Sequence, residues 1–432
     1  MIPPPASRPE DAAGRALAAA FASYLGVTAR AFFRLGESLP EPLREPWRRA
    51  ALAVQRAYAK SPRPVLGCFA SPTVGSAIHA APLRASLTEF ADRIDAALAL
   101  ATPHLLLELA LRRLLPDGEP LDWPAAAPLS SLALGATLGP PSRASALRFA
   151  PGELRALDGE AVLDALPLHP DAVRERLDPA GTHTDEFTAT ATYLPVGKVT
   201  RFAIVNHNPL AEFEAHPDKA GNALDLGGRS VDDWRATLDE AFALVAAHAP
   251  GVFAEMGMML HEVLPVGYHD ERHLSASYRE AIGTVYLTLH PNVMTMAEAL
   301  IHEFQHNKMN VASYSMDLLE NPFHPRYPSP VRPDPRPLWG ILLAVHAFLP
   351  VAVLYRNMRA ADHPWSRRPD FARRMAEIDL KNHEGMEMLR QHARWTPAGR
   401  ALMDELDALD RAHMAERAAE GLPTTPDSVH LA

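Results

Sequence analysis

Cysteine is almost absent from this chain. Cys68 is the only cysteine in 432 residues, so neither an internal disulfide nor a cysteine-rich metal site can form. This usage is typical of a reducing compartment, and we expect Cys68 to be a small core residue. The segment from Met1 to Glu10 is rich in proline and lacks the apolar stretch of a secretory signal. The sequence therefore predicts a cytoplasmic protein.

Lysine is also scarce, and the chain has no excess of positive charge. The net charge is -10, no run of like charges occurs, and lysine is found only at Lys60, Lys198, Lys219, Lys308 and Lys381. Nucleic-acid binding requires clustered basic side chains that neutralise phosphates, so we expect no nucleic-acid partner. Small molecules or peptides are the expected partners.

A long uninterrupted apolar run is missing as well. The longest one, from Trp339 to Tyr355, contains His346 and Pro350 and falls short of the roughly 20 residues that span a bilayer. It predicts a buried helix, and we expect no membrane partner.

The remaining composition, with 47% hydrophobic residues, predicts a globular chain with a large core divided into two or three lobes. Residues 10–115 are rich in alanine and leucine at helical spacing. Residues 116–150 are rich in proline, glycine and serine, which is typical of a linker or an irregular wrap. We therefore predict a helical N-terminal lobe over residues 1–180.

The pattern changes after Glu186. A β-hairpin is predicted over residues 187–205 because alternating and β-branched residues flank a turn at Pro195 to Lys198. Helices and strands are then expected as follows: a helix over 231–248, strands over 258–266 and 284–289, and helices over 338–355, 369–392 and 397–419. The fold class is α+β and predominantly α-helical. Residues 181–432 are expected to form a catalytic lobe with a small sheet beside a zincin-like HExxH helix.

The segment His302-Glu303-Phe304-Gln305-His306 carries the clearest chemical signal. Residues four apart on a helix project from the same face, so His302 and His306 can bind one transition-metal ion. Apolar residues at helical spacing place the motif on an amphipathic helix, about residues 294–310; they are Met296, Ala297, Leu300, Ile301 and Phe304.

A catalytic metal usually has a third protein ligand. The extended pattern HExxHxxGxxH fails, because Met309 and Ala312 occupy its glycine and third histidine positions. Glu320 lies near the spacing at which other zincins place a glutamate, but in an expected loop. His346 is the favoured third ligand, because a histidine in the most apolar helix, about residues 336–355, needs either a hydrogen bond or a metal. The competing candidates are His324, His383 and Glu384.

Two arginines lie in a proline-rich loop between the motif and that helix. Proline at alternate positions stiffens the loop and holds Arg332 and Arg336 close to the start of the helix. A guanidinium binds carboxylates through a bidentate fork, so Arg336, or otherwise Arg332, is a candidate for binding a dicarboxylate beside the metal. The alternative is that both are surface charges.

Four segments together resemble a known family. They are residues 302–308 (HEFQHNK), 327–330 (YPSP), 332–338 (RPDPRPL) and 346–349 (HAFL). This set is similar to the HExxH-motif peptide-modification proteins, described as 2-oxoglutarate-dependent HExxH-type peptide β-hydroxylases. The similarity covers roughly residues 231–355 and includes Ser275-Ala276-Ser277. Many family members have an aromatic residue at the position of His346 and a histidine where this chain has Leu343.

The resemblance implies a non-haem Fe(II) enzyme that uses O2 and 2-oxoglutarate to β-hydroxylate a residue of a ribosomally made precursor peptide. It implies that Glu303 orients a ligand or water. Two alternatives remain open from the residues alone. One is a zinc metallopeptidase with Glu303 as general base, and the other is an inactive peptide-binding homologue.

Overall fold

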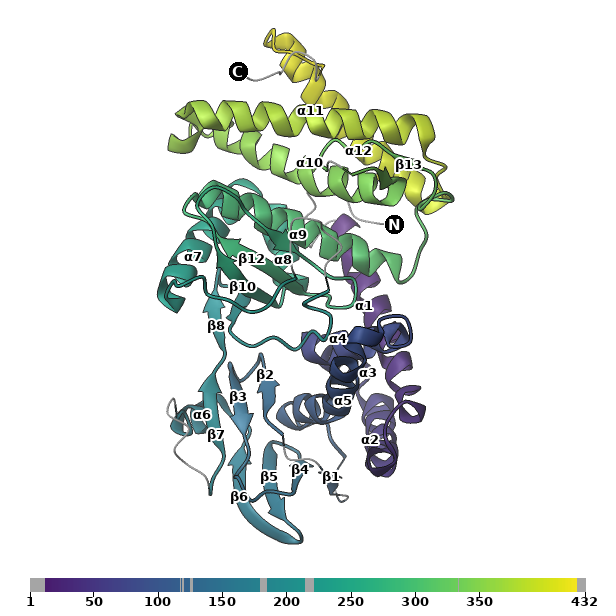
Figure 1. The fold of residues 1–432 in the computed structure, drawn as a ribbon, viewed down its shortest axis with the longest axis vertical. Coiled ribbons are helices and arrows are strands. Elements are labelled where there is room, and N and C mark those ends of the chain that lie inside the picture. Colours follow the sequence, from purple (N-terminus) through teal and green to yellow (C-terminus); the bar gives the residue numbers. More distant parts are fainter. Residues whose placement is uncertain are drawn as a thin grey trace.

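The computed structural model of the chain describes residues 12–116, 118, 120–124, 127–178, 185–213, 221–332 and 334–425. The proline-rich segment from Met1 to Glu10 lies outside the described residues. The described chain is mixed α+β and mostly helical, as predicted. Figure 1 shows an elongated arrangement, with the N-terminal helices and two small sheets at one end and the last three long helices at the other.

Helices form the first part of the chain, and they are α1 (Ala12–Phe32), α2 (Glu41–Lys60), α3 (Pro62–Cys68), α4 (Pro72–Ala80) and α5 (Ala91–Leu111), with the 3-10 turns η1 (Leu35–Glu37), η2 (Ala81–Leu83) and η3 (Thr88–Phe90). Proline stands in the first turn of α2, α3 and α4, where its missing N–H costs no hydrogen bond. Cys68 is fully buried, which confirms its predicted place in the core.

The prediction of a linker over residues 116–150 is wrong. This region and the residues after it form two antiparallel sheets, in the orders β1-β4-β5-β6 and β2-β3-β7. Their strands are β1 (Leu121–Trp123), β2 (Leu129–Ser131), β3 (Ala136–Gly139), β4 (Ala146–Ala150), β5 (Glu153–Asp158), β6 (Ala161–Pro167) and β7 (Thr188–Ala191). The short helix α6 (Pro170–Glu175) follows β6. The strands were not predicted because they are short and lie between prolines and glycines, and such a composition is typical of a linker. The N-terminal half of the chain is therefore not purely helical.

A five-stranded sheet lies at the centre of the molecule, in the order β11-β12-β10-β9-β8. Its strands are β8 (Tyr193–Val196), β9 (Thr200–Ala203), β10 (Glu262–Tyr268), β11 (Ser275–Ala276) and β12 (Thr284–Leu289). β10 runs parallel to both neighbours, and β11 pairs antiparallel with β12 at the edge. The predicted hairpin is confirmed at β8 and β9, whose turn contains Gly197 and Lys198 with positive φ. The segment before it pairs instead with β3 in another sheet.

Helices cover the central sheet and extend beyond it. They are α7 (Val231–His248), α8 (Pro250–Met259), α9 (Val293–Ser313), α10 (Leu338–Ala360), α11 (Pro369–His392) and α12 (Pro397–Ala419), with the 3-10 turn η4 (Pro364–Arg367) and the two-stranded pair β13 (Arg326–Tyr327) and β14 (Arg336–Pro337). α9 lies between α7, β12 and α10, and α11 packs on the far side of α10 (Figure 1). α8 was not predicted: Pro250 occupies the first turn of a new helix, so the expected strand begins only at Glu262.

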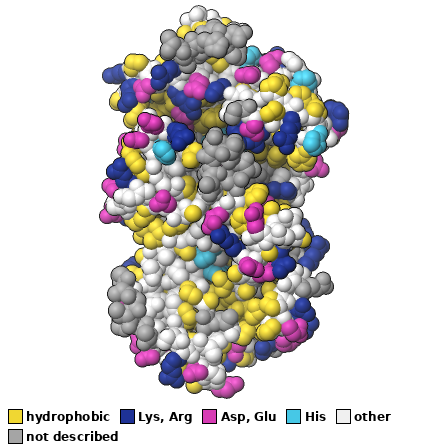
Figure 2. Space-filling view, in the orientation of Figure 1, with side chains coloured by type: hydrophobic (Ala, Val, Ile, Leu, Met, Phe, Trp, Pro, Cys, Tyr) yellow, Lys and Arg dark blue, Asp and Glu magenta, His cyan; other side chains and the backbone are white. Residues whose placement is uncertain are grey.

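Two of the described helical stretches, Thr88–Leu111 and Leu338–Ala360, are long and apolar enough to cross a membrane. In the most apolar 18 residues of each stretch, 67% and 72% of the residues respectively are buried inside the protein, as in the core helix of a packed domain. This confirms the prediction of a buried helix for α10, although that helix is longer than the apolar run. Acidic and basic side chains are interspersed over the face drawn in Figure 2.

Candidate metal centre

The motif helix α9 begins directly after β12. Asn292 caps it, because its side-chain oxygen accepts a hydrogen bond from the N–H of Met294 at 3.0 Å. The predicted apolar residues are all buried, from Met296 to Phe304, and they fix which face of the helix points away from the core. The rings of His302 and His306 lie on the same face with centroids 4.4 Å apart.

Glu303 completes a group of three possible metal ligands. One donor atom from each of His302, Glu303 and His306 lies within 4.8 Å of the others. The side chain of Glu303 is held by Ser277, whose hydroxyl donates to its Oε2 at 2.7 Å. Ser277 directly follows the edge strand β11, so the sheet edge fixes the carboxylate beside the two imidazoles.

Both imidazoles are in the state that binds metals. Burial is the main cause that lowers the pKa of His302 and of His306, so each is neutral at neutral pH. The Nδ1 atoms of both rings are buried and have no hydrogen-bond partner among the described residues. A buried ring nitrogen without a partner loses free energy relative to water, and a metal ion satisfies such a group. The residues present therefore fit a transition-metal ion.

The surroundings of His302 come from three other parts of the chain. The ring of Phe348 on α10 lies 4.5 Å from the ring of His302. His306, His273 and Arg374, in that order, further lower the pKa of His302, which places the loop before β11 and helix α11 within electrostatic reach of the ring.

A cavity of about 500 Å³ continues from this side of α9. His273, Glu298, Tyr355 and Arg374 line it, among others. Glu298 precedes His302 by four residues and therefore shares its helix face. Glu298 accepts hydrogen bonds from Tyr355 and from Arg374, the latter at 2.7 Å. Arg374 also donates to Glu377 at 3.0 Å. The site thus has an adjoining polar cavity with a guanidinium in its wall.

His346 is buried within α10, as predicted, but it is not a member of the three-residue group. Phe348, two residues further along α10, contacts His302, and the charge of His306 acts on His346, so this part of α10 lies within electrostatic reach of the group. Neither of its ring nitrogens has a hydrogen-bond partner among the described residues. Burial, then Lys308 and His306, lower its pKa.

The competing candidates also lie outside the group. His383 bonds to Asp410 through its Nδ1 atom at 2.9 Å, and Glu320 lies in a loop, as expected, 3.6 Å from Arg394. His324 lies in the loop before β13, and Glu384 follows His383 on α11.

The two predicted cosubstrate arginines pair with the same carboxylate. Arg332 and Arg336 bind Asp334 at 3.2 Å and 3.0 Å, in and beside β14. The structure records no contact between either of them and the three-residue group within the described residues. Arg374 is the arginine that acts on His302. The sequence offered no signal for it, because it comes from a separate helix far along the chain.

Lys308 lies two residues after the last motif residue, His306, on α9. Its side chain is fully buried and pairs with the fully buried Glu255 of α8 at 2.8 Å. This ion pair joins the motif helix to α8.

No protein-family model matches this chain, and no curated protein sequence matches it. The geometry contributes two neutral imidazoles, an anchored carboxylate and an adjoining cavity with an arginine.

Proposed function

We propose that this chain is a non-haem Fe(II), 2-oxoglutarate-dependent oxygenase that β-hydroxylates a residue of a ribosomally synthesised precursor peptide. The observation that carries the proposal is the convergence of His302, Glu303 and His306 within 4.8 Å, with two neutral imidazoles whose Nδ1 atoms lack partners among the described residues. The two imidazoles supply two of the protein ligands that a non-haem iron centre needs, and the carboxylate of Glu303 lies beside them. The resemblance of the four motif segments supports the same class.

The residues of the site have separate tasks in this proposal. His302 and His306 would hold the iron, which when bound supplies the activation of O2 while 2-oxoglutarate is converted to succinate and CO2. Glu303, fixed by the hydroxyl of Ser277, orients a ligand or water beside the imidazoles. Phe348 packs on His302 and excludes water from one side of its ring.

Arg374 is the best-placed residue for the distal carboxylate of 2-oxoglutarate. It lines the cavity that begins one helical turn before His302, and its charge acts on that ring. Its Nε and Nη2 atoms bind Glu298 and its Nη1 atom binds Glu377, so the cosubstrate carboxylate would have to displace one of these glutamates to form a bidentate pair. Arg336, the arginine predicted from the sequence, binds Asp334 and is the competing candidate.

An anaerobic titration with Fe(II) and 2-oxoglutarate tests the proposal. A visible charge-transfer band is expected, and with a cognate peptide each turnover should add one oxygen atom to the peptide and release one succinate. Retention of zinc with cleavage of the peptide backbone would establish the peptidase alternative. If neither a charge-transfer band nor peptide cleavage is observed, the chain is an inactive peptide-binding homologue.

Matched substitutions show which of the two arginines, Arg374 or Arg336, binds 2-oxoglutarate. Arg374→Gln should raise the KM for 2-oxoglutarate about tenfold or more while metal content stays stoichiometric, because a charge-assisted bidentate contact is lost. Arg336→Gln should leave this KM near that of the unchanged protein. The reverse result would assign the cosubstrate to Arg336, as the sequence alone predicted.

A zinc metallopeptidase is the second candidate, and one contact favours it. Ser277 places Glu303 next to the edge strand β11, whose outer side can accept an extended peptide by strand addition. In that enzyme Glu303 would act as general base toward a water molecule. Glu303→Gln would then abolish peptide cleavage without loss of metal.

A further inference from the structure

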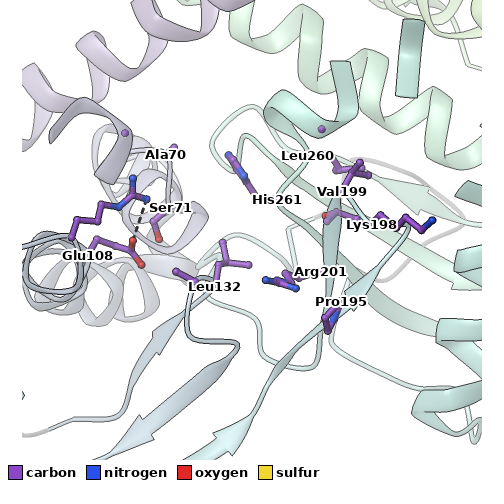
Figure 3. A pocket seen from close by; sticks show the side chains of 15 residues that line it. Ala70, Ser71, Glu108, Leu132, Pro195, Lys198, Val199, Arg201, Leu260 and His261 are labelled. Carbon is purple, nitrogen blue, oxygen red and sulfur yellow. Dashed lines mark hydrogen bonds and ion pairs between the residues drawn. The ribbon is translucent and has the colours of Figure 1, made fainter. Parts of the chain in front are cut away.

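A second cavity lies away from the candidate metal centre, between the N-terminal helices and the central sheet. Its volume is about 370 Å³, which lies within the range of small-molecule sites. Its walls come from the junction of α3 and α4, the end of α5, the turn after β2, the hairpin of β8 and β9, and the end of α8 (Figure 3). No described residue of α9, α10 or α11 lines it, so it is separate from the site around His302.

The cavity is rich in positive charge although the chain as a whole is acidic. Arg112, Lys198 and Arg201 line it, whereas Glu108 is the only acidic residue among its described lining residues. Glu108 already accepts hydrogen bonds from Ser131 at 3.1 Å and from Arg112 at 3.5 Å. The excess positive charge is therefore not neutralised by the lining itself.

Arg112 pairs with Glu108, whereas the side chains of Arg201 and Lys198 have no hydrogen-bond or ion-pair partner among the described residues. In Figure 3, Arg201 and His261 reach into the cavity from the sheet side, opposite Glu108, while Lys198 extends away from both. A guanidinium that is held on a central strand and lacks a carboxylate partner offers a preorganised fork to an anion.

A neutral donor lines the same cavity as this guanidinium. The Nε2 atom of His261 is buried and has no hydrogen-bond partner in the described chain. Buried polar groups of this kind are usually satisfied by a protein group, water or a ligand.

We propose that this cavity binds a small oxyanion, a phosphate or carboxylate group of a metabolite-sized molecule, with Arg201 as its main anchor. His261 donates a hydrogen bond to the same anion, and Arg112 adds charge from the opposite wall. Apolar residues complete the lining, among them Leu132, Val199 and Leu260, and they accommodate the uncharged part of the molecule. This site is independent of the proposed oxygenase function.

Calorimetric titration of the full-length protein with inorganic phosphate, and separately with succinate and citrate, tests the proposal at constant ionic strength. One-site binding of at least one probe is expected. Binding of phosphate alone would identify a phosphate ligand, and binding of the carboxylates alone would identify a carboxylate ligand. Failure of all three probes to bind at millimolar concentration would overturn the proposal.

Three variants test whether Arg201 is the residue that binds the anion. Arg201→Gln should weaken binding about tenfold or more, because the charge and the fork are both lost. Arg63→Gln, which removes an exposed arginine of α3 outside the cavity, should bind like the unchanged protein. Arg201→Lys keeps the charge without the fork and should bind more weakly than the unchanged protein, so the proposal stays testable even if Arg201→Gln fails to fold. Unchanged affinity in a folded Arg201 variant would place the anion elsewhere and refute the assignment.

Discussion

At the residue scale, the chemistry of the site depends on buried groups whose polar atoms lack partners. The Nδ1 atoms of His302 and His306 are buried without hydrogen bonds among the described residues, in a helix that is otherwise well packed. A metal ion bound by the two imidazoles would offset this cost.

Replacement of either histidine should therefore remove the metal. We expect His302→Ala and His306→Ala each to reduce bound metal far below one equivalent, measured by elemental analysis after loading with Fe(II). His392→Ala is the control, because His392 is exposed and stacks on Tyr327 in another part of the molecule. Full metal content in both motif variants would contradict the assignment.

His346→Leu separates the two ways of completing the site. If the ligands come from α9, this variant should keep its metal and be as stable as the unchanged protein or more so, since a buried imidazole without partners is replaced by an apolar side chain. Loss of metal on this substitution would instead make His346 the third ligand, as the sequence predicted.

Glu262 makes the stability of the folded protein depend on pH. Burial is the first cause that raises the pKa of this carboxyl to about 7, while a hydrogen bond from Thr284 lowers it. The folded state thus binds the proton more tightly than the unfolded state. This stabilising effect is complete below the ordinary carboxyl pKa and is lost as the pH rises to about 7.

Glu262→Gln should remove this dependence. At pH 8 the variant should be more stable than the unchanged protein by up to roughly 3 kcal/mol, and at pH 4 the two should be similar. Urea unfolding at both pH values measures the difference. Glu240→Gln, on the exposed face of α7, should show no comparable gain at pH 8.

At the element scale, the ends of helices are set by particular side chains. α7 begins with a capping box, in which the Ser230 hydroxyl accepts from the N–H of Asp233 at 3.1 Å and the Asp233 carboxylate accepts from the N–H of Ser230 at 3.0 Å. These bonds satisfy N–H groups that the helix itself cannot satisfy. α7 packs against α9, so its start helps to position the motif helix.

Ser230→Ala should lower the free energy of unfolding by about 1 kcal/mol, because one of the two reciprocal hydrogen bonds is lost. Chemical denaturation checks the value. Ser61→Ala is a matched control, since Ser61 stands at the same position before α3 but makes no capping hydrogen bond with its side chain. An equal loss in both variants would mean that the capping box contributes nothing specific.

At the scale of the whole molecule, buried polar contacts join helices that the chain order keeps apart. The pair of Lys308 and Glu255 lies between α9 and α8 with both side chains fully buried. Arg356 of α10 binds Asp379 of α11 at 2.8 Å and Glu416 of α12 at 2.5 Å. These contacts fix the order in which the C-terminal helices stack over α9.

Breaking the buried pair from one side should be costly. Lys308→Met should lower the free energy of unfolding by about 3–5 kcal/mol, because Glu255 loses its cation in the core. The double variant Lys308→Met, Glu255→Met should recover most of that loss. A double-mutant cycle from denaturation curves measures the coupling, and additive losses would show that the two charges do not depend on each other.

The local pattern of the chain was sufficient to predict several elements correctly. α7, β12, α11 and α12 have the boundaries that periodicity and their flanking residues predict, because an amphipathic repeat with a clear start and stop depends only on neighbours along the chain. The spacing of His302 and His306 likewise places both rings on one face of α9 without any tertiary information.

Only the tertiary structure decided what surrounds those rings. Ser277 reaches Glu303 from a sheet edge, Arg374 approaches His302 from α11, and Lys308 is buried because α8 supplies Glu255. Each contact joins residues far apart in sequence, and no periodic pattern encodes which distant side chain meets which. Whether His346 can act as the third ligand depends on the rotation of α10 about its axis. Packing against α9 and α11 sets that rotation, and the residues of α10 alone do not.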